Sequence, residues 1–166
     1  MPAPLRPFRL LTLACAAVVL AGCGGPRPKP QPLPRFTAPT RHKGEVSAND
    51  ILFRAIGLVG TPYRYGGNTP DGGFDCSGLI GYVYLNSVGE APPRTVARMA
   101  GFGAPVPMSE LRTGDLVLFG ASTPSHAGIY VGNGRFVHAP STGGVVRLDR
   151  LDGVYWSRQV VQARRP

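Results

Sequence analysis

Phe74-Asp75-Cys76-Ser77-Gly78-Leu79 opens a run of helix-forming sequence that ends at Gly89. Apolar side chains recur at positions 79, 80, 83, 84 and 88, the spacing of one helix face, and no proline interrupts the run. The pattern predicts a helix over 75–88 with Gly89 as its stop signal. Cys76 falls in the first turn, where free N–H groups and the helix dipole stabilise an anion. We interpret Cys76 as a candidate nucleophile with an acidified thiol.

A second helix is predicted upstream of this one. Ser47 offers an N-cap hydroxyl and Asp50 an acid three residues on; apolar residues follow at helical spacing up to Val59, and Gly60 ends the pattern. The next stretch, 61–73, contains too much glycine and proline for a regular element, so we predict a shaped loop. Loops of this kind often carry function.

The pattern changes after residue 100, from helical spacing to short β-branched runs bounded by Gly, Asn, Asp or Pro. A short helix is predicted at 95–100. The predicted strands are 116–119, 126–131, 135–138, 145–148 and 159–163. Helices first and an antiparallel sheet afterwards indicate an α+β fold, with N-terminal helices packed on a C-terminal antiparallel sheet of about five strands.

Two histidines, His126 and His138, flank a predicted hairpin turn. A two-residue loop would send them to opposite faces of the sheet, whereas a three-residue loop at Gly132-Asn133-Gly134 would place them on one face, one diagonal apart. We predict the second register, or a bulge equivalent to it. On a shared face His138 hydrogen-bonds the His126 ring and orients it toward Cys76. A nucleophile, a base and an orienting residue result.

The other two cysteines lie near the N-terminus. Residues 1–22 combine a cationic start, an apolar run and small residues before Cys23, the pattern of an export signal. The apolar run is far shorter than the roughly 20 residues that span a bilayer. Leu20-Ala21-Gly22-Cys23 resembles the bacterial lipoprotein processing site, and this resemblance implies that Cys23 becomes the first residue and carries the lipid. Cys15 is then discarded, which leaves Cys76 as the free thiol.

Residues 23–44 are predicted to be a tether. The segment holds six prolines and five basic residues with no acid, so it cannot bury a core and favours an extended conformation. Residues 45–166 suffice for one compact domain, which we expect to be a monomer. The net charge of +9 falls to +2 in this domain, which has eleven arginines and nine acids. This balance argues against nucleic acid as a partner.

The motifs of this domain resemble those of the NlpC-type cell-wall hydrolases, a papain-like cysteine peptidase family. The resemblance covers essentially all of residues 50–165 and implies a papain-like fold. The matching motifs, in the order of the family, are Gly60-Thr61-Pro62-Tyr63-Arg64-Tyr65-Gly66-Gly67, Asp75-Cys76-Ser77-Gly78-Leu79, Gly114-Asp115-Leu116-Val117, His126-Ala127-Gly128-Ile129-Tyr130-Val131 and Phe136-Val137-His138-Ala139-Pro140.

The resemblance assigns roles to individual residues. It implies that Cys76 is the nucleophile, His126 the base and His138 the orienting polar residue. Tyr63 matches a tyrosine that helps to bind the oxyanion together with the backbone N–H of the cysteine.

The resemblance also implies a substrate and a location. Asp75 and Ser77 match residues that line the site for the amino terminus of a peptidoglycan stem peptide. The implied reaction is hydrolysis of stem-peptide or cross-link bonds that involve diaminopimelate, with no metal or cofactor. Lipoproteins without Asp directly after the lipidated Cys usually reach the outer membrane, and residue 24 is glycine. We therefore expect a lipid-anchored protein on the periplasmic face of the outer membrane.

Other interpretations stay open at this point. The domain could be a catalytically silent scaffold that holds wall fragments, or an amidase or acyltransferase on another amide or lipid. Cys76, His126 and His138 also make up a known zinc-binding set, although twelve residues separate the two histidines, and zinc ligands are usually closer.

Several conspicuous side chains receive structural interpretations. We predict that Tyr65, Tyr82 and Tyr84 serve packing and that Asp115 serves turn chemistry ahead of a strand. Trp156 is either a core residue or a wall of the substrate groove.

Overall fold

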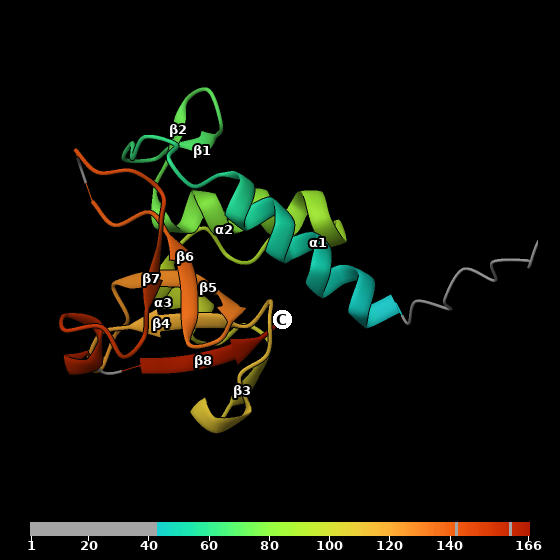
Figure 1. The fold of residues 1–166 in the computed structure, drawn as a ribbon, viewed down its shortest axis with the longest axis vertical. Helices are drawn as coiled ribbons and strands as arrows, with labels where there is room; N and C mark the ends of the chain where they lie inside the picture. The colour runs from blue at the N-terminus through green and yellow to red at the C-terminus, as the bar shows by residue number, and fades with distance from the viewer. Residues whose placement is uncertain (1–42, 142, 160) are drawn as a thin grey trace, which may run out of the picture. The chain divides into compact units, whose positions relative to one another are not determined.

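The structure is a computed structural model that describes residues 43–141, 143–159 and 161–166. The predicted export signal, Cys23 and the predicted tether up to residue 42 lie outside these residues. Helices come first and the main sheet follows, so the predicted α+β class is confirmed (Figure 1). The helices are α1 (Lys43–Gly57), α2 (Cys76–Val88) and α3 (Val96–Met99), with short 3₁₀ turns η1 (Met108–Glu110) and η2 (Trp156–Arg158).

Helix α1 begins at Lys43, so the predicted N-cap at Ser47 is wrong. Ser47 and Asp50 lie inside the helix. A cap-like sequence does not mark the start of a helix when the residues before it are helical as well. The helix ends at Gly57, and a turn leads to Gly60, whose φ of 95° suits only glycine well. No helix in the described part of the chain is long and apolar enough to cross a membrane.

Helix α2 matches its prediction closely. Asp75 is the N-cap and accepts a hydrogen bond from the backbone N–H of Gly78 at 2.6 Å. Gly89 is the C-cap in the left-handed conformation, with φ of 82°. Both ends are therefore defined by residues next to the helix, which explains why the local sequence suffices to place it.

The main sheet has six antiparallel strands in the order β3-β8-β4-β5-β6-β7. Their bounds are β3 (Ala104–Val106), β4 (Leu116–Phe119), β5 (His126–Gly132), β6 (Arg135–His138), β7 (Arg147–Arg150) and β8 (Val161–Arg165). A separate small sheet of β1 (Asn68–Thr69) and β2 (Gly73–Phe74) lies in the predicted loop. The five predicted strands all exist, and the last two begin two residues later than predicted.

Strand β3 is the strand of the main sheet that the sequence pattern does not predict. It is three residues long, it contains Pro105, and it pairs only with β8 at the edge of the sheet. Proline is compatible with an edge strand because no neighbour on that side needs its missing N–H. Pairing with a partner nearly 60 residues away, rather than local pattern, therefore creates this strand.

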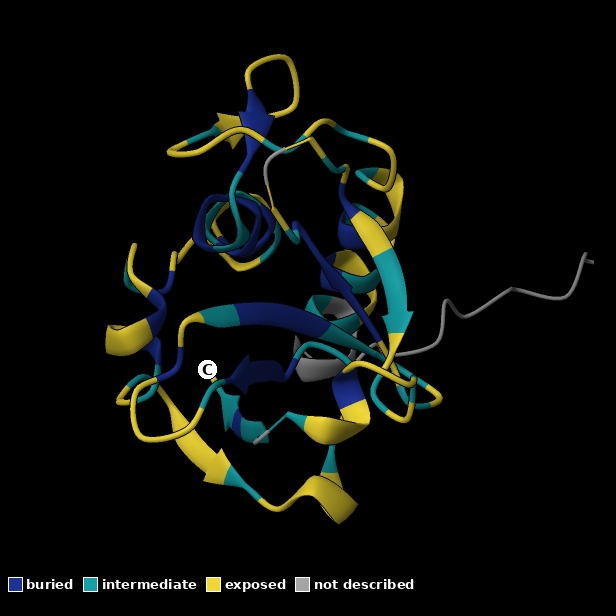
Figure 2. Cartoon of the chain, turned by 90° about the vertical axis from the view of Figure 1, so that its left-hand side faces the viewer, coloured by how far each residue is buried: buried dark blue, intermediate teal, exposed yellow. Residues whose placement is uncertain are grey.

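Both faces of the sheet are covered. On one face, Leu118, Ala127 and Ile129 pack with Leu79 and Ile80 of α2 in the larger core cluster. The opposite face carries a smaller cluster of Val117, Phe119, Phe136 and Trp156. Figure 2 shows the buried residues concentrated in the central strands and on the facing sides of the helices. Strand β4 is buried along its whole length for this reason, which matches its continuous apolar sequence.

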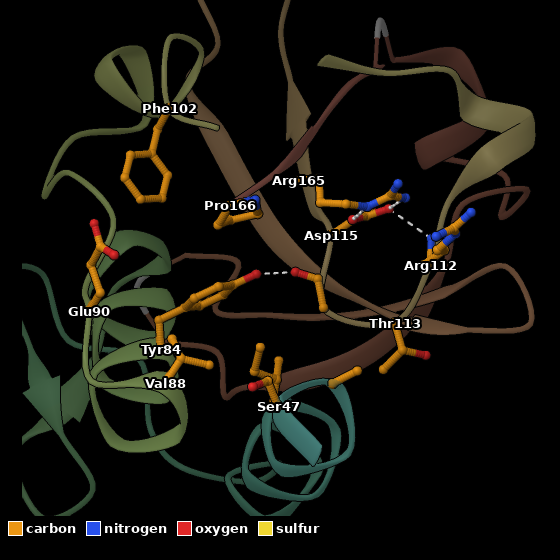
Figure 3. Close-up of a pocket in the computed structure, with 13 residues that line it drawn as sticks. Ser47, Tyr84, Val88, Glu90, Phe102, Arg112, Thr113, Asp115, Arg165 and Pro166 are labelled. Atoms are coloured by element: carbon orange, nitrogen blue, oxygen red, sulfur yellow. Dashed lines mark hydrogen bonds and ion pairs between the residues drawn. The ribbon is translucent and has the colours of Figure 1, made fainter. Parts of the chain in front are cut away.

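Asp115 ties the end of β8 to the start of β4. Its buried carboxylate accepts two hydrogen bonds from Arg165, each at 2.8 Å, and one from the backbone N–H of Arg112 at 2.7 Å. Tyr84 is buried and donates its hydroxyl proton to the Gly114 carbonyl. Figure 3 shows both contacts at the wall of a cavity of about 740 Å³. The structural interpretations of Asp115 and Tyr84 hold, and none of the predicted catalytic residues lines this cavity.

Candidate active site

Cys76 is the first residue of α2, and the preceding Asp75 organises the chain around it. Besides the Gly78 N–H, the Asp75 carboxylate accepts hydrogen bonds from the Ser77 hydroxyl at 2.9 Å and from the Gly66 N–H at 2.9 Å. The glycine-rich loop and the start of the helix thus share one carboxylate. Asp75 and Ser77 flank Cys76, and both hold its position through these hydrogen bonds. Their contact with a stem peptide stays a prediction.

Arg94 closes this cluster from a segment that the sequence pattern left without a role. Its guanidinium contacts both Asp75 oxygens, at 2.7 and 3.2 Å, and donates to the carbonyls of Gly66 and Gly67. A further contact reaches the Ser77 hydroxyl. Burial favours the neutral acid at Asp75, but the hydrogen bonds from Arg94, Gly78 and Ser77 prevail and lower its pKa below the ordinary value. A lone arginine after two prolines carries no sequence signal for such a role.

The thiol of Cys76 is free and packs against the larger core cluster. The backbone N–H groups of Ser77 and Ala127 face the sulfur and favour the thiolate. Burial has the opposite effect and is larger, and the Asp75 charge adds to it, so the pKa of Cys76 is raised above its ordinary value. The predicted acidification of the thiol is therefore wrong for the substrate-free protein, because local helix geometry does not reveal desolvation.

Tyr63 lies where the resemblance places it. Its backbone pairs with Phe74, the residue two before Cys76, and it lines a cavity of about 340 Å³ together with Arg64 and Tyr65. Burial raises the pKa of the Tyr63 hydroxyl, and the nearby Cys76 raises it further, so the phenol stays protonated and available as a donor. Tyr65 is 88% exposed, so its predicted packing role is wrong.

His126 and His138 meet through the predicted register. Ile129 pairs with Val137 and Tyr130 with Phe136, and a bulge lies between Tyr130 and Gly132. The two rings are on one face, and His126 Nε2 lies 2.9 Å from His138 Nδ1. The prediction of a three-residue loop or an equivalent bulge is confirmed.

Gly128 makes room for the Phe136 ring and for the adjacent strand β6. A Cβ atom at this position would lie 2.6 Å from Cδ2 of Phe136, 3.0 Å from the Val137 carbonyl oxygen and 3.2 Å from Cβ of His138. Only glycine lets β6 pack this closely over β5. The glycine of the His126-Ala127-Gly128 run therefore belongs to the architecture of the site.

His138 continues the hydrogen-bonded chain to Asp149, a residue of β7. His138 Nε2 lies 3.0 Å from Asp149 Oδ2, and the indole N–H of Trp156 donates to the same oxygen at 2.8 Å. Arg147 completes the group with bonds of 2.6 to 3.0 Å to Asp149. No local pattern joins Asp149 to the histidines, since an Arg-x-Asp pair also occurs at Arg150-Leu151-Asp152.

Of the two roles that the sequence left open for Trp156, the structure shows the core residue, and the groove wall stays a prediction. Trp156 is nearly buried in the smaller core cluster, and its ring stacks on His126 with centroids 5.4 Å apart and planes 23° apart. Its edge meets His138 at a centroid distance of 5.0 Å. Trp156 is therefore a core residue that also packs against both histidines.

The two histidines are neutral at neutral pH. Burial, together with the neighbouring His138 and against a partial offset from Asp149, lowers the pKa of His126 to about 3. Burial also lowers the pKa of His138, against the opposing effect of Asp149. Burial favours the neutral acid at Asp149, yet hydrogen bonds from Arg147, Trp156 and His138 bring its pKa to about 2. A neutral imidazole at His126 is the form that acts as a base.

The arrangement is suited to acyl transfer by a thiol. Cys76 lies beside Ala127, the residue that follows His126, while His126 is oriented through Nε2 by His138. In the hydrogen bonds of the described residues His126 uses Nε2, which leaves Nδ1 for the thiol proton. Over those same residues, no group of three or more His, Cys, Asp or Glu side chains is placed to hold a metal ion.

Comparison with known proteins gives consistent matches. The model of the NlpC/P60 family matches residues 60–165. Murein DD-endopeptidase MepH of Escherichia coli K12 is 46% identical over 131 residues, which cover 75% of this chain and 48% of that protein. Murein DD-endopeptidase MepS/murein LD-carboxypeptidase of the same strain is 43% identical over 107 residues, 64% of this chain and 56% of that protein. The chain thus spans about half the length of these relatives.

Solved structures agree with the fold. The crystal structure of the NlpC/p60 domain of the peptidoglycan hydrolase SagA superposes with a TM-score of 0.63 at 31% sequence identity. The match covers 71% of this chain and 98% of that domain. The papain-like fold is confirmed.

Proposed function

The chain belongs to the NlpC/P60 family, and on this basis we propose that it is a cysteine peptidase that hydrolyses peptide bonds of peptidoglycan. The observation that carries the proposal is the hydrogen bond of 2.9 Å between His126 and His138, which orients a neutral imidazole at the strand end beside Cys76. A silent scaffold would have no use for this arrangement. The names of MepH and MepS support the same substrate class.

The chemistry follows from the three side chains. His126 takes the proton of Cys76 at Nδ1 as the sulfur attacks the carbonyl carbon; a C–S bond forms and the carbonyl electron pair moves to oxygen. When the tetrahedral intermediate collapses, the C–N bond breaks and the leaving amine receives the proton from His126. Water then attacks the acyl-enzyme with His126 again as base, and the Cys76 thiol is restored.

The high pKa of the buried thiol makes proton transfer part of the attack. A neutral thiol and a neutral imidazole are the resting forms, so the thiolate forms when the substrate carbonyl is in place. The phenol of Tyr63 and the backbone N–H of Cys76 are proposed to donate to the oxyanion. Asp75 is proposed to meet the amino-terminal part of the stem peptide, with Ser77 beside it.

We propose the D-alanyl to diaminopimelate cross-link as the bond attacked. Family members cut either this bond or the γ-D-glutamyl to diaminopimelate bond, and the relatives named DD-endopeptidases favour the first. Cleavage of the cross-link turns a dimeric muropeptide into two monomers, whereas cleavage within the stem shortens a monomer.

The experiment is digestion of purified dimeric and monomeric muropeptides, with the products identified by mass spectrometry. Wild-type protein should convert dimers to monomers, with or without a metal chelator, and Cys76→Ala should not. Asn86→Ala, an exposed change near the other end of the same helix, is the matched control and should keep full activity. Cleavage by Cys76→Ala would refute the proposal. Release of shortened stems would move the proposed bond to the γ-glutamyl linkage, and turnover of other amides alone would indicate an amidase or acyltransferase.

We also propose that the protein is a lipoprotein anchored at the periplasmic face of the outer membrane and acts as a monomer. The export signal of residues 1–22, the small residues before Cys23 and Gly24 after it support the anchor. In a host with two membranes, fractionation should find the wild type with the outer membrane and Cys23→Ala in soluble or unprocessed form. Unchanged membrane attachment of Cys23→Ala would contradict the anchor. Sedimentation of the detergent-solubilised protein tests the monomer.

A further inference from the structure

Asp149 is a partly buried carboxylate that accepts hydrogen bonds from three side chains behind His126. It lies opposite Phe136 in the pairing of β6 with β7, so it shares a sheet face with the two catalytic histidines. Its Oδ2 accepts hydrogen bonds from His138 Nε2 at 3.0 Å and from Trp156 Nε1 at 2.8 Å. Arg147 binds both of its oxygens.

The protons of this group follow from the chemistry of each partner. An ionised carboxylate only accepts, and the indole and guanidinium only donate, so His138 must carry its proton on Nε2. A neutral His138 then has a lone pair on Nδ1. Since Nδ1 of His138 lies 2.9 Å from Nε2 of His126, the proton in that hydrogen bond belongs to His126. A neutral His126 with Nε2–H has its free lone pair on Nδ1.

We propose that Asp149 is a positioning residue of the active site, whose carboxylate sets the tautomers of His138 and His126 so that Nδ1 of His126 receives the Cys76 proton. The other tautomer of His126 would carry a proton on Nδ1 and could not act as a base there. Asp149 acts through His138 and touches neither the thiol nor the substrate.

No proton travels along the chain in this scheme. When Cys76 attacks, its proton moves to Nδ1 of His126, and the imidazolium keeps its Nε2–H bond to His138. His138 keeps its Nε2–H bond to Asp149, which stays ionised throughout. The negative charge stabilises the imidazolium through one intervening ring.

Trp156 links the same carboxylate to the base by a second route. The indole N–H is held by Asp149 while the indole ring stacks on His126. An aromatic face beside an imidazolium is favourable. Without the carboxylate, the tautomer of His138 is no longer set and the Trp156 ring is no longer held against His126.

The charges around the histidines determine the expected change in pH dependence. His126 interacts with His138 of β6 and Asp149 of β7, and His138 also interacts with Arg147 of β7. Cys76, Asp75 and Tyr63 interact with one another around the nucleophile. A negative charge raises the pKa of each nearby group. Its removal should therefore lower the pKa of His126 and weaken it as the base for the Cys76 proton, so that alkylation at neutral pH slows.

The test measures the thiol directly. The full-length protein is treated with iodoacetamide from pH 5 to pH 10, and peptide mass spectrometry follows alkylation of Cys76 alone. Asp149→Ala should lower the alkylation rate at neutral pH by roughly 10- to 100-fold, the range for residues that orient a group through one neighbour. The alkylation rate of Asp149→Asn should lie between those of the wild type and Asp149→Ala, because the amide carbonyl can still accept a hydrogen bond from His138 Nε2–H. Circular dichroism checks that each variant is folded. If Asp149→Ala unfolds, the comparison of alkylation rates is made with Asp149→Asn.

Asp152→Asn is the matched control, because Asp152 forms the equivalent Arg-x-Asp pair with Arg150 at the surface. It should leave the rate and the pH profile unchanged. With muropeptides, the Asp149 variants should lose kcat while KM stays constant. A wild-type rate and pH profile in Asp149→Ala, or an equal loss in Asp152→Asn, would overturn the inference.

The inference rests on the proposed function because it takes Cys76 as the nucleophile. The two fail separately: a wild type that reacts rapidly with iodoacetamide but leaves muropeptides intact would refute the proposed substrate and leave the role of Asp149 standing.

Discussion

Burial of neutral His126 should make the stability of the protein fall as the solution becomes mildly acidic. The folded chain holds the pKa of His126 at about 3, against 6.5 for the unperturbed side chain. Below pH 6.5 the unfolded chain therefore binds a proton that the folded chain excludes. Linkage requires the free energy of unfolding to drop on the way down to pH 3 and to be nearly flat above pH 7.

The size of the effect follows from the two pKa values. Each pH unit between them costs about 1.4 kcal/mol, and integration from pH 7 to pH 5 gives a loss of about 2 kcal/mol from His126. His138 contributes in the same direction, because burial lowers its pKa too. Asp149, with a pKa of about 2, stays ionised over this range and adds little.

The assay is urea denaturation followed by far-ultraviolet circular dichroism at pH 7, 6 and 5. His126→Gln removes the titrating ring. Between pH 7 and pH 5, the free energy of unfolding of this variant should therefore fall by about 2 kcal/mol less than that of the wild type. The absolute stability of the variant does not matter, since the slope with pH is the measurement. His42→Gln, in the predicted tether, is the matched control and should keep the wild-type slope. Parallel slopes for wild type and His126→Gln would refute the buried neutral imidazole.

Two further substitutions test the packing that holds the site. Gly128→Ala should destabilise the fold by about 1 to 3 kcal/mol in thermal melts and reduce peptidase activity, because its methyl group would overlap Phe136. Gly81→Ala is the control, because Gly81 of α2 has open space around it; this variant should be neutral or stabilising in the same melts. Arg94→Gln should lower kcat/KM on muropeptides roughly tenfold with a stability loss near 1 kcal/mol, because it frees Asp75 and two loop carbonyls at a partly exposed position; unchanged kinetics would show that the loop holds its shape without the guanidinium.

Local features of the fold were predictable from neighbouring residues. The ends of α2 depend on Asp75 and Gly89, which lie directly beside the helix; Gly89 was predicted as its stop signal, and the predicted start at Asp75 differs from the observed one by one residue. The histidine register depends on the turn and on alternation along two adjacent strands, and it too was predictable. Ser47 misled because a capping pattern has meaning only where the helix starts, and here the helix starts earlier.

The partners that complete the site were not predictable in this way. Arg94 reaches Asp75 across 19 positions, and Asp149 reaches His138 across 11. Nothing in the residues around Asp149 distinguishes it from Asp152, which has the same spacing to an arginine. The strand pairing of β7 with β6 makes the difference, because it turns Asp149 toward the histidines while Asp152 lies beyond the strand.

The sequence by itself determined the candidate nucleophile, its two histidine partners and the α+β order of the elements, because these depend on helix caps, turn residues and side-chain alternation within short stretches. The tertiary structure decided the protonation of the site. Burial raises the pKa of Cys76 and lowers that of His126, which reverses the expectation of an acidified thiol at rest. Desolvation is a property of the packed molecule, since it depends on everything that excludes water from a group, and no stretch of sequence around Cys76 contains that information.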